Sequence, residues 1–132
     1  MAQALNVLDV IYPSQMPGPP GQKFLLADQG SAGTEQDCTT PGYRFIRGTI
    51  NIKSGMSNSN TFTFRVQCDD NSSQASPDIV YTSPALTFIT NTVNVSQTFF
   101  GICQQANGFR YFKIIGTDSG GTAVYDALVE VW

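Results

Sequence analysis

Histidine is absent from this 132-residue chain, and charged residues make up only 13% of it. Histidine is the commonest general base at neutral pH, so its absence removes most schemes that activate a serine, a cysteine or a water. A G-x-S-x-G motif is also missing. The segment GTDSGG at 116–121 is therefore interpreted as a tight turn between two strands. We expect no catalytic residues and a protein that is not an enzyme.

Basic residues are few and scattered. Seven Lys and Arg against ten Asp and Glu give a net charge of -3. The basic residues form no stripe that could neutralise phosphates, so nucleic-acid binding is not expected. No apolar run approaches the ~20 residues of a membrane-spanning helix. The opening MAQALNVLDVIYPSQ lacks the charged start and long apolar stretch of a signal peptide. We expect a soluble, unexported protein that does not enter a membrane.

Cysteine is also scarce. The three cysteines, Cys38, Cys68 and Cys103, form no C-x-x-C pair, and their odd number does not fit a secreted disulfide framework. Cys68 ends an alternating segment and Cys103 follows an apolar one, which favours free, buried thiols. Whether any two of them pair stays open at this point.

Metal-binding patterns are missing as well. Close carboxylate pairs occur only at Asp69–Asp70 and Glu35–Asp37, and neither has the ligand spacing of a calcium loop. We interpret them as solvated loop charges. No metal and no other cofactor is expected.

Alternating apolar and polar residues are what the chain does have. In TFTFRVQC at 61–68, Phe62, Phe64, Val66 and Cys68 share one face, as in a half-buried strand. The segment YRFIRGTINIK at 43–53 alternates in the same way, with Ile46, Ile50 and Ile52 on its apolar face. Further strands are expected at 5–12, 23–27, 79–82, 92–100, 109–116 and 122–132.

About eight short strands with frequent turn signals predict an all-β fold, a single antiparallel β-sandwich of jelly-roll type. Residues 23–132 are expected to form this sandwich. Residues 1–22 are expected to form an extended N-terminal arm, because 13–22 hold four of the seven prolines. The polar stretch 69–78 is expected to be a mobile loop.

Aromatic side chains are the candidates for contact with another molecule. Phe100 and Phe112 are predicted to point outward, where they either lie under loops or meet a partner. The last strand is apolar on both faces, with Tyr125, Ala127, Val129 and Val131 on one face and Val124, Leu128 and Trp132 on the other. Such a strand is central and covered, in contact with a partner chain, or covered by a loop of the same chain.

Three long segments of the sequence resemble a known family. They are TFTFRVQCDDNSSQASPDIVYTSPALTF, TVNVSQTFFGICQQANGFRYFKIIGT and SGGTAVYDALVEVW. Together they are similar to the jelly-roll cement, or decoration, proteins of tailed-bacteriophage capsids, over roughly residues 43–132. The shared features are the strand and polar loop with its S-P turn, the strand ending in paired aromatics, the R-Y-x-K strand and the closing strand.

The resemblance implies a structural virion protein on the outer capsid surface, made in the host cytoplasm. Its partner would be the major capsid protein, and it would form a homotrimer. The arm and the loop tips at one end of the sandwich are then expected to attach to the shell, and the aromatic strand faces to contact other subunits. The candidate interface residues are Leu5, Val7, Tyr12, Met16, Pro19, Pro20, Phe100, Phe112 and Trp132.

Two other hypotheses about the function stay open. A carbohydrate-binding β-sandwich module would also use exposed rings and Asn- and Gln-rich loops. Another phage structural protein, of the tail or connector, would share the fold and differ in its partner.

Overall fold

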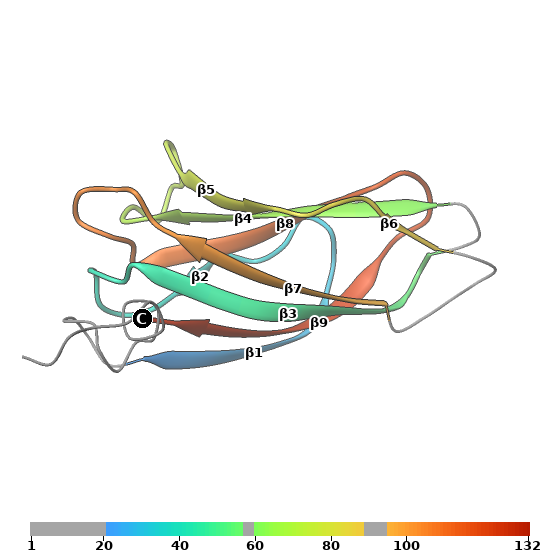
Figure 1. Cartoon of the computed structure of the whole chain (residues 1–132), viewed down its shortest axis with the longest axis horizontal. Coiled ribbons are helices and arrows are strands. Elements are labelled where there is room, and N and C mark those ends of the chain that lie inside the picture. Colours follow the sequence, from blue (N-terminus) through green and yellow to red (C-terminus); the bar gives the residue numbers. More distant parts are fainter. Residues whose placement is uncertain (1–20, 57–59, 89–94) are drawn as a thin grey trace, which may run out of the picture.

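The computed structural model describes residues 21–56, 60–88 and 95–132, which form nine strands and no helix (Figure 1). No described helix could therefore span a membrane. The strands are β1 (Gln22–Gln29), β2 (Gln36–Asp37), β3 (Phe45–Ser54), β4 (Thr61–Asp69), β5 (Asp78–Thr82), β6 (Leu86–Thr87), β7 (Val95–Ile102), β8 (Tyr111–Asp118) and β9 (Val124–Val131).

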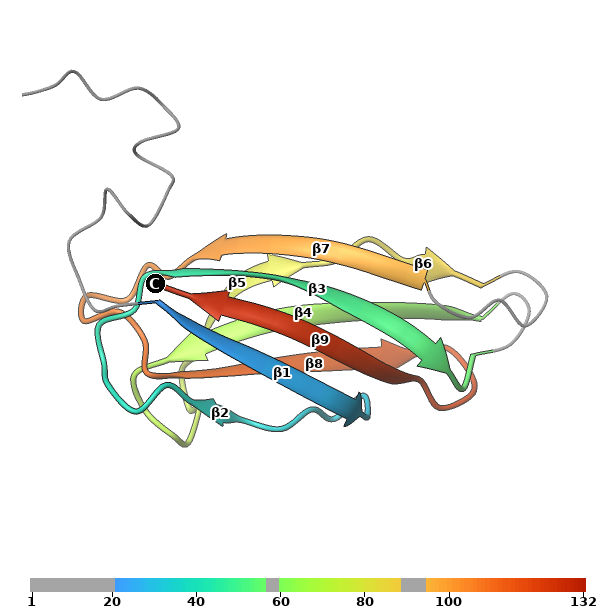
Figure 2. The same ribbon diagram turned by 90° about the horizontal axis from the view of Figure 1, so that it is seen from below.

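The strands form two antiparallel sheets packed face to face (Figures 1 and 2). The four-stranded sheet has the order β1-β9-β3-β7. The five-stranded sheet has the order β2-β8-β4-β5, and β6 also pairs with β4. The first strand thus pairs with the last, and the second pairs with the penultimate. This nested pairing across two sheets is a jelly roll, which confirms the predicted all-β sandwich.

The core lies between the sheets and follows the alternation read from the sequence. Ile46, Ile50 and Ile52 of β3 are fully buried, and Phe62 and Phe64 of β4 face them from the other sheet. Each strand contributes every second residue, because successive side chains point to opposite faces of a sheet. The predicted inward faces of both strands are confirmed.

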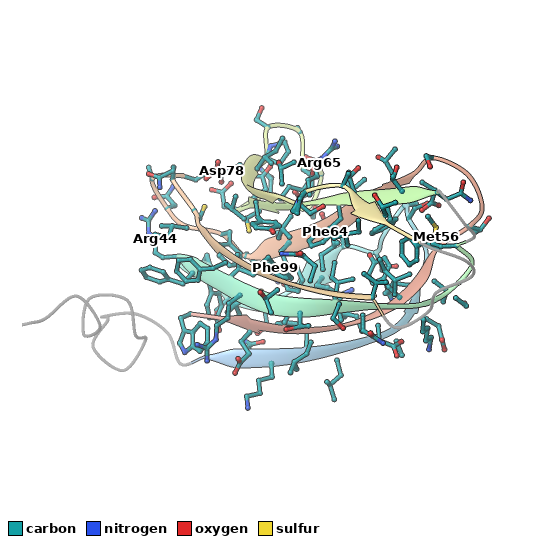
Figure 3. All side chains as sticks on the ribbon, turned by 45° about the vertical axis from the view of Figure 1, so that its right-hand side comes forward. Arg44, Met56, Phe64, Arg65, Asp78 and Phe99 are labelled. Atoms are coloured by element: carbon teal, nitrogen blue, oxygen red, sulfur yellow. The ribbon has the colours of Figure 1, made fainter. Side chains whose placement is uncertain are left out.

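Aromatic rings fill the centre of the core. Phe64 meets Phe99 edge to face at a centroid distance of 6.0 Å, and Figure 3 shows both side chains between the sheets. Tyr81 packs against both rings. Gly48 lies beneath the Phe99 ring, and a Cβ there would come within 2.7 Å of that ring and 2.4 Å of the Leu128 carbonyl oxygen. The absent side chain at residue 48 is what lets this ring occupy the core.

Some details differ from the prediction. The two-residue strands β2 and β6 were not expected. Gln22, assigned above to the arm, pairs with Val131 and so belongs to the sandwich. The strand expected at 5–12, the proline-rich segment up to residue 20 and the first residues of the strand expected at 92–100 lie outside the described residues. GTDSGG ends β8 and forms the turn into β9, as predicted.

Candidate functional site

The residues expected at an interface fall into three groups. Phe100 and Trp132 lie on the outside of the four-stranded sheet, and Phe100 is 42% exposed. Phe112 was predicted to point outward and this is wrong, because its ring is fully buried and packs edge to face on Phe24 at 5.1 Å. The other candidates lie outside the described residues; these are Leu5, Val7, Tyr12, Met16, Pro19 and Pro20.

The side of the four-stranded sheet that is turned away from the core is called the outer face here. It carries four of the five large apolar side chains that are exposed among the described residues. They are Leu25, Phe100, Ile102 and Leu128, and the fifth, Ile79, belongs to β5 in the other sheet. Exposed apolar groups gathered on one face of a sheet mark a surface that is suited to docking.

Strand register aligns the centre of the outer face into one row. Leu25 of β1 lies opposite Leu128 of β9, Leu128 lies opposite Thr49 of β3, and Thr49 lies opposite Thr98 of β7. Phe100 lies one row further along. The last strand is therefore central in its sheet, but the covering that the same alternative predicted is not seen among the described residues, since Leu128 remains 43% exposed on its outer side.

Charged side chains cross the outer face next to this row. Glu130 of β9 lies between Lys23 of β1 and Arg47 of β3, with ion-pair distances of 3.7 and 3.1 Å. The Arg47 guanidinium also lies 4.5 Å from the centre of the Trp132 ring. Exposed pairs of this kind contribute only about 0–1 kcal/mol each to stability. Their main effect is to set the pattern of charge that a docking molecule meets.

A second charged group lies at the other end of the outer face. Lys53 pairs with Asp126 at 3.0 Å and also with Asp28. Asp28 sits in a β-bulge with a φ of 54°, and its backbone N–H donates to Asp126. That hydrogen bond and Lys53 lower the pKa of Asp126, and hydrogen bonds to Asp28 and Asp126 raise the pKa of Lys53. The cluster holds opposite charges paired at neutral pH.

The outer face is also hollowed in two places. A depression of about 480 Å³ lies beside Leu25, and another of about 260 Å³ lies beside Phe100. Thr49 and Leu128 line both, so the two depressions meet at the middle of the sheet. An apolar centre with charged groups at its rim is the usual anatomy of a protein–protein contact surface.

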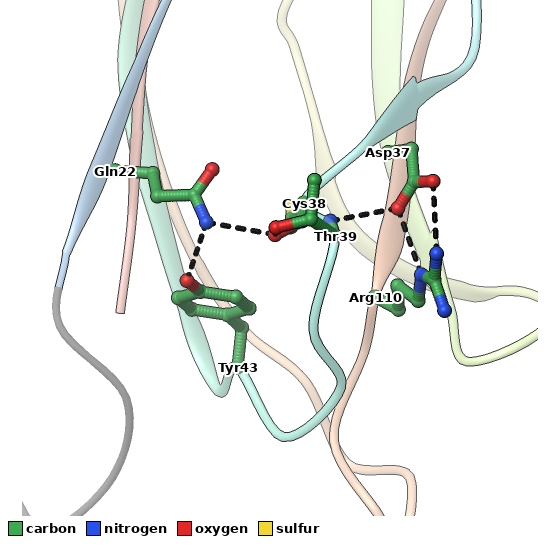
Figure 4. A network of polar contacts seen from close by, with 6 residues as sticks. All are labelled: Gln22, Asp37, Cys38, Thr39, Tyr43 and Arg110. Carbon is green, nitrogen blue, oxygen red and sulfur yellow. Dashed lines mark hydrogen bonds and ion pairs between the residues drawn. The ribbon is translucent and has the colours of Figure 1, made fainter.

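A separate polar network joins the two sheets at one end of the sandwich (Figure 4). The Gln22 side-chain amide donates to the Cys38 carbonyl at 2.7 Å and to the Tyr43 hydroxyl at 2.8 Å. Arg110 donates two hydrogen bonds to the Asp37 carboxylate, at 2.8 and 3.1 Å. These bonds, with one from the Thr39 backbone N–H, lower the pKa of Asp37. The network fixes β1 and β2 in place.

The three cysteines are free and buried, as predicted. Burial raises the pKa of each thiol, that of Cys38 to about 12. Since the thiolate is the nucleophilic form, these side chains are held in their unreactive state at neutral pH. They pack as small apolar groups of the core.

The prediction of solvated loop charges is wrong at two positions, since Asp37 lies in strand β2 and pairs with Arg110, and Asp69 is buried. Asp69 was expected as a solvated loop charge and this is wrong, because it ends β4 and is buried. Its carboxylate accepts the backbone N–H of Asn71, and its carbonyl accepts that of Arg110. Within 21–56, 60–88 and 95–132, no three potential metal-ligating side chains come together.

No protein-family model, no curated protein and no solved structure matches the chain.

Sequence reasoning missed two members of the outer face. Leu25 was not singled out because it is followed directly by Leu26, and such a doublet does not show which residue points inward. Ile102 shares its face with Phe100 at a spacing of two, so period-2 alternation from Phe100 could have identified it. Leu128 was placed on one of the two apolar faces of the last strand, but neither face was identified as the outward one.

Proposed function

We propose that this chain is a structural virion protein, a cement protein that binds the outer surface of a tailed-phage capsid and stabilises the assembled shell. The observation that carries the proposal is the outer face: Leu25, Leu128, Phe100 and Ile102 are exposed together on a rigid sheet. The jelly-roll topology supports the same family as the resemblance of residues 43–132.

The chemistry of the outer face favours a protein surface as the ligand. Three of its four exposed apolar side chains are aliphatic, and sugars are gripped chiefly by rows of flat rings. Its cations are already paired, Lys23 and Arg47 with Glu130, and Lys53 with Asp126. A surface of this kind would bind chiefly through apolar contact, and binding should weaken little with added salt.

Stabilisation of a shell needs no chemical step. A protein that binds the assembled lattice and not its free subunits stabilises the lattice by RT ln(1 + [L]/Kd) at each site. Repetition over many sites and trimer avidity then allow modest single contacts to suffice. The major capsid protein as partner and the homotrimer are parts of the same proposal.

Co-sedimentation tests the proposal. The full chain is mixed with purified expanded capsids and with unexpanded procapsids of tailed phages, and bound protein is measured against its free concentration. We expect saturable binding to an expanded shell and at least 10-fold weaker binding of the Phe100→Lys variant. The matched control is Ile79→Lys, an apolar position on the other sheet that is 53% exposed.

Two results would contradict the proposal. One is a folded protein that binds no expanded shell at tens of micromolar. The other is equal loss of binding in Phe100→Lys and Ile79→Lys, which would show that the outer face is not the docking surface.

A further inference from the structure

β1 is an edge strand with an open side. Among the described strands it pairs only with β9, over a length of 8 residues. Figure 2 shows it at the border of the four-stranded sheet, with β2 in the other layer. The outward-facing backbone groups of an edge strand are a template for another strand.

The hydrogen-bond pattern identifies which residues face the open side. Trp132 and Phe45 exchange backbone hydrogen bonds of 2.8 and 2.9 Å, so the backbone groups of Trp132 point toward β3. Those of the preceding residue, Val131, therefore point toward β1, where Gln22 lies opposite. Alternation then turns Gln22 and every second residue after it toward β9. Lys23 and Leu25 direct their N–H and C=O groups to the open side.

Leu25 combines two features that natural edge strands usually avoid. Its side chain is 83% exposed, the most of any large apolar residue described, and its backbone groups face outward. The devices that normally blunt an edge, a lysine and a bulge, flank it at Lys23 and Asp28. The middle of the strand is left open.

We propose that β1 pairs antiparallel with β1 of a second copy of this chain, about a two-fold axis at Leu25. Each Leu25 would exchange hydrogen bonds with the other, and Lys23 would lie opposite Ala27 of the second copy. The four-stranded sheets of the two copies would then join edge to edge into one continuous sheet.

Charge and the bulge disfavour two alternative registers, those centred on Lys23 and on Ala27. Centring the axis on Lys23 would put two ammonium groups directly opposite each other, which destabilises a strand pair. Centring it on Ala27 would place the bulge at Asp28 next to the axis. With the axis at Leu25, the 74% exposed Lys23 side chain lies near Asp28 of the second copy, whose side chain is 73% exposed. The two-fold repeats this favourable pairing.

The same register completes an apolar row. Leu25 already lies opposite Leu128 within one copy. Across the axis the order becomes Leu128, Leu25, Leu25, Leu128, which covers the side chains that are most exposed at this edge. One existing hydrogen bond must change. The Gln29 side-chain amide donates to the Ala27 carbonyl at 3.0 Å, and this carbonyl would have to accept from the second copy as well or instead.

Edge pairing has a limited strength and leaves the outer face open. One strand from each copy covers less than the ~1,600 Å² of a standard interface, so association should depend on protein concentration. The contact does not rest on the proposed function. If the chain also forms trimers through other surfaces, β1 would link neighbouring trimers, and Phe100 of both copies would face the same side.

Disulfide capture tests the register. The native cysteines are buried, so an introduced Leu25→Cys thiol would be the exposed one among the described residues. Opposite residues of a hydrogen-bonded antiparallel pair have Cα atoms about 5.5 Å apart, within disulfide range. With oxidised glutathione as the oxidant, we expect Leu25→Cys to form a covalent dimer at least 10-fold faster than Lys23→Cys.

A mixing experiment sharpens the same test. A copy carrying Lys23→Cys should cross-link with a copy carrying Ala27→Cys, because the register places residue 23 of one copy opposite residue 27 of the other. Neither variant should cross-link with a second copy of itself. Equal rates for Leu25→Cys and Lys23→Cys, or self-linking of Lys23→Cys, would overturn the proposal.

Sedimentation velocity provides a second measurement without a covalent bond. As the protein concentration rises, we expect the full chain to form particles that have twice the mass of the particles formed by the Leu25→Lys variant. The dissociation constant should rise at least 10-fold in Leu25→Lys and stay unchanged in Ile79→Lys. Phe100 lies on β7, away from the β1 edge, so retained association of Phe100→Lys, together with its weakened binding to capsids, would separate this contact from the proposed function.

Removal of residues 1–20 distinguishes a second copy from the chain's own N-terminal segment. If that segment covered β1, the full chain would not pair and the shortened chain would. That outcome would overturn the proposal, whereas pairing of the full chain supports it.

Discussion

At the scale of single residues, the Asp37–Arg110 pair shows how one side chain links segments that are distant in sequence. Asp37 lies in β2 and Arg110 just before β8, and the two hydrogen bonds between them are parallel. This forked geometry is the strongest that arginine and a carboxylate can form. Both side chains are exposed, so we expect the contribution to stability to be modest.

The Asp37→Asn variant should reveal this contribution through its pH dependence. The pKa of Asp37 in the folded protein is lowered from its usual 3.8. The ionised carboxylate therefore stabilises the folded state fully above pH 3.8, and this stabilisation is lost as the pH falls through the lowered pKa. The difference in unfolding free energy between the two proteins should be constant from pH 6 to 8 and vanish in acid. Urea denaturation over this range measures it.

Asp70→Asn is the matched control, because Asp70 makes no ion pair within the described residues. A difference between the wild type and Asp37→Asn that persists or grows in acid would refute the role given to this carboxylate.

Side-chain direction was predictable only where alternation is clean. Phe62 and Phe64 are separated by threonines, and both were placed correctly in the core. Phe112 follows Tyr111 directly, so the aromatic pair leaves the phase of the strand undecided. Burial of Phe112 against Phe24 comes from tertiary packing, which the local pattern does not contain.

At the scale of elements, the approach of β3 to its neighbours depends on one glycine. Gly48 lies between Leu128 of β9 and Phe99 of β7, opposite Val129 and Phe99 in register. A methyl group there would meet the Leu128 carbonyl oxygen, which is backbone and cannot rotate away. The three strands could accommodate it only by shifting apart or by moving the Phe99 ring.

We expect Gly48→Ala to lower the free energy of unfolding by about 1–3 kcal/mol through overpacking. Gly30→Ala is the control, since no atom lies within 4 Å of a Cβ at that position. It should be neutral or stabilise by up to about 1 kcal/mol, because alanine restricts the unfolded chain. Chemical denaturation of both variants checks this, and equal stabilities would contradict the packing assigned to Gly48.

The long strands were predictable from the sequence and the shortest ones were not. β4 and β9 alternate over enough residues to be recognised, whereas β2 and β6 have two residues each and show no period. They are strands because β8 and β4 offer paired backbone groups beside them. That is a property of the assembled sheet.

At the scale of the whole molecule, the topology joins the two ends of the domain. β1 pairs with β9, and every sheet neighbour except β4–β5 and β4–β6 is distant in sequence. Such pairings require large loops to close before any contact forms. A jelly roll was expected from the number of strands and the turn signals, but no local sequence pattern predicts the order of strands within each sheet.

Folding should therefore be slow for a chain of this size, with a time constant of milliseconds to seconds. Stopped-flow refolding from urea, followed by the fluorescence of the single tryptophan, measures it. Refolding completed in microseconds would be incompatible with the formation of these distant pairs as the limiting step.

The register of Gln22 opposite Val131 also sets the mechanical behaviour of the domain. Both residues lie at the same end of adjacent antiparallel strands, so tension applied between Gly21 and Trp132 would pull perpendicular to the strands. The hydrogen bonds between β1 and β9 would then open one after another, which needs little force. Load spread over the broad sides of the sheets would instead act on all strands together. A molecule built this way should resist compression and shear across its faces far better than stretching between those two residues.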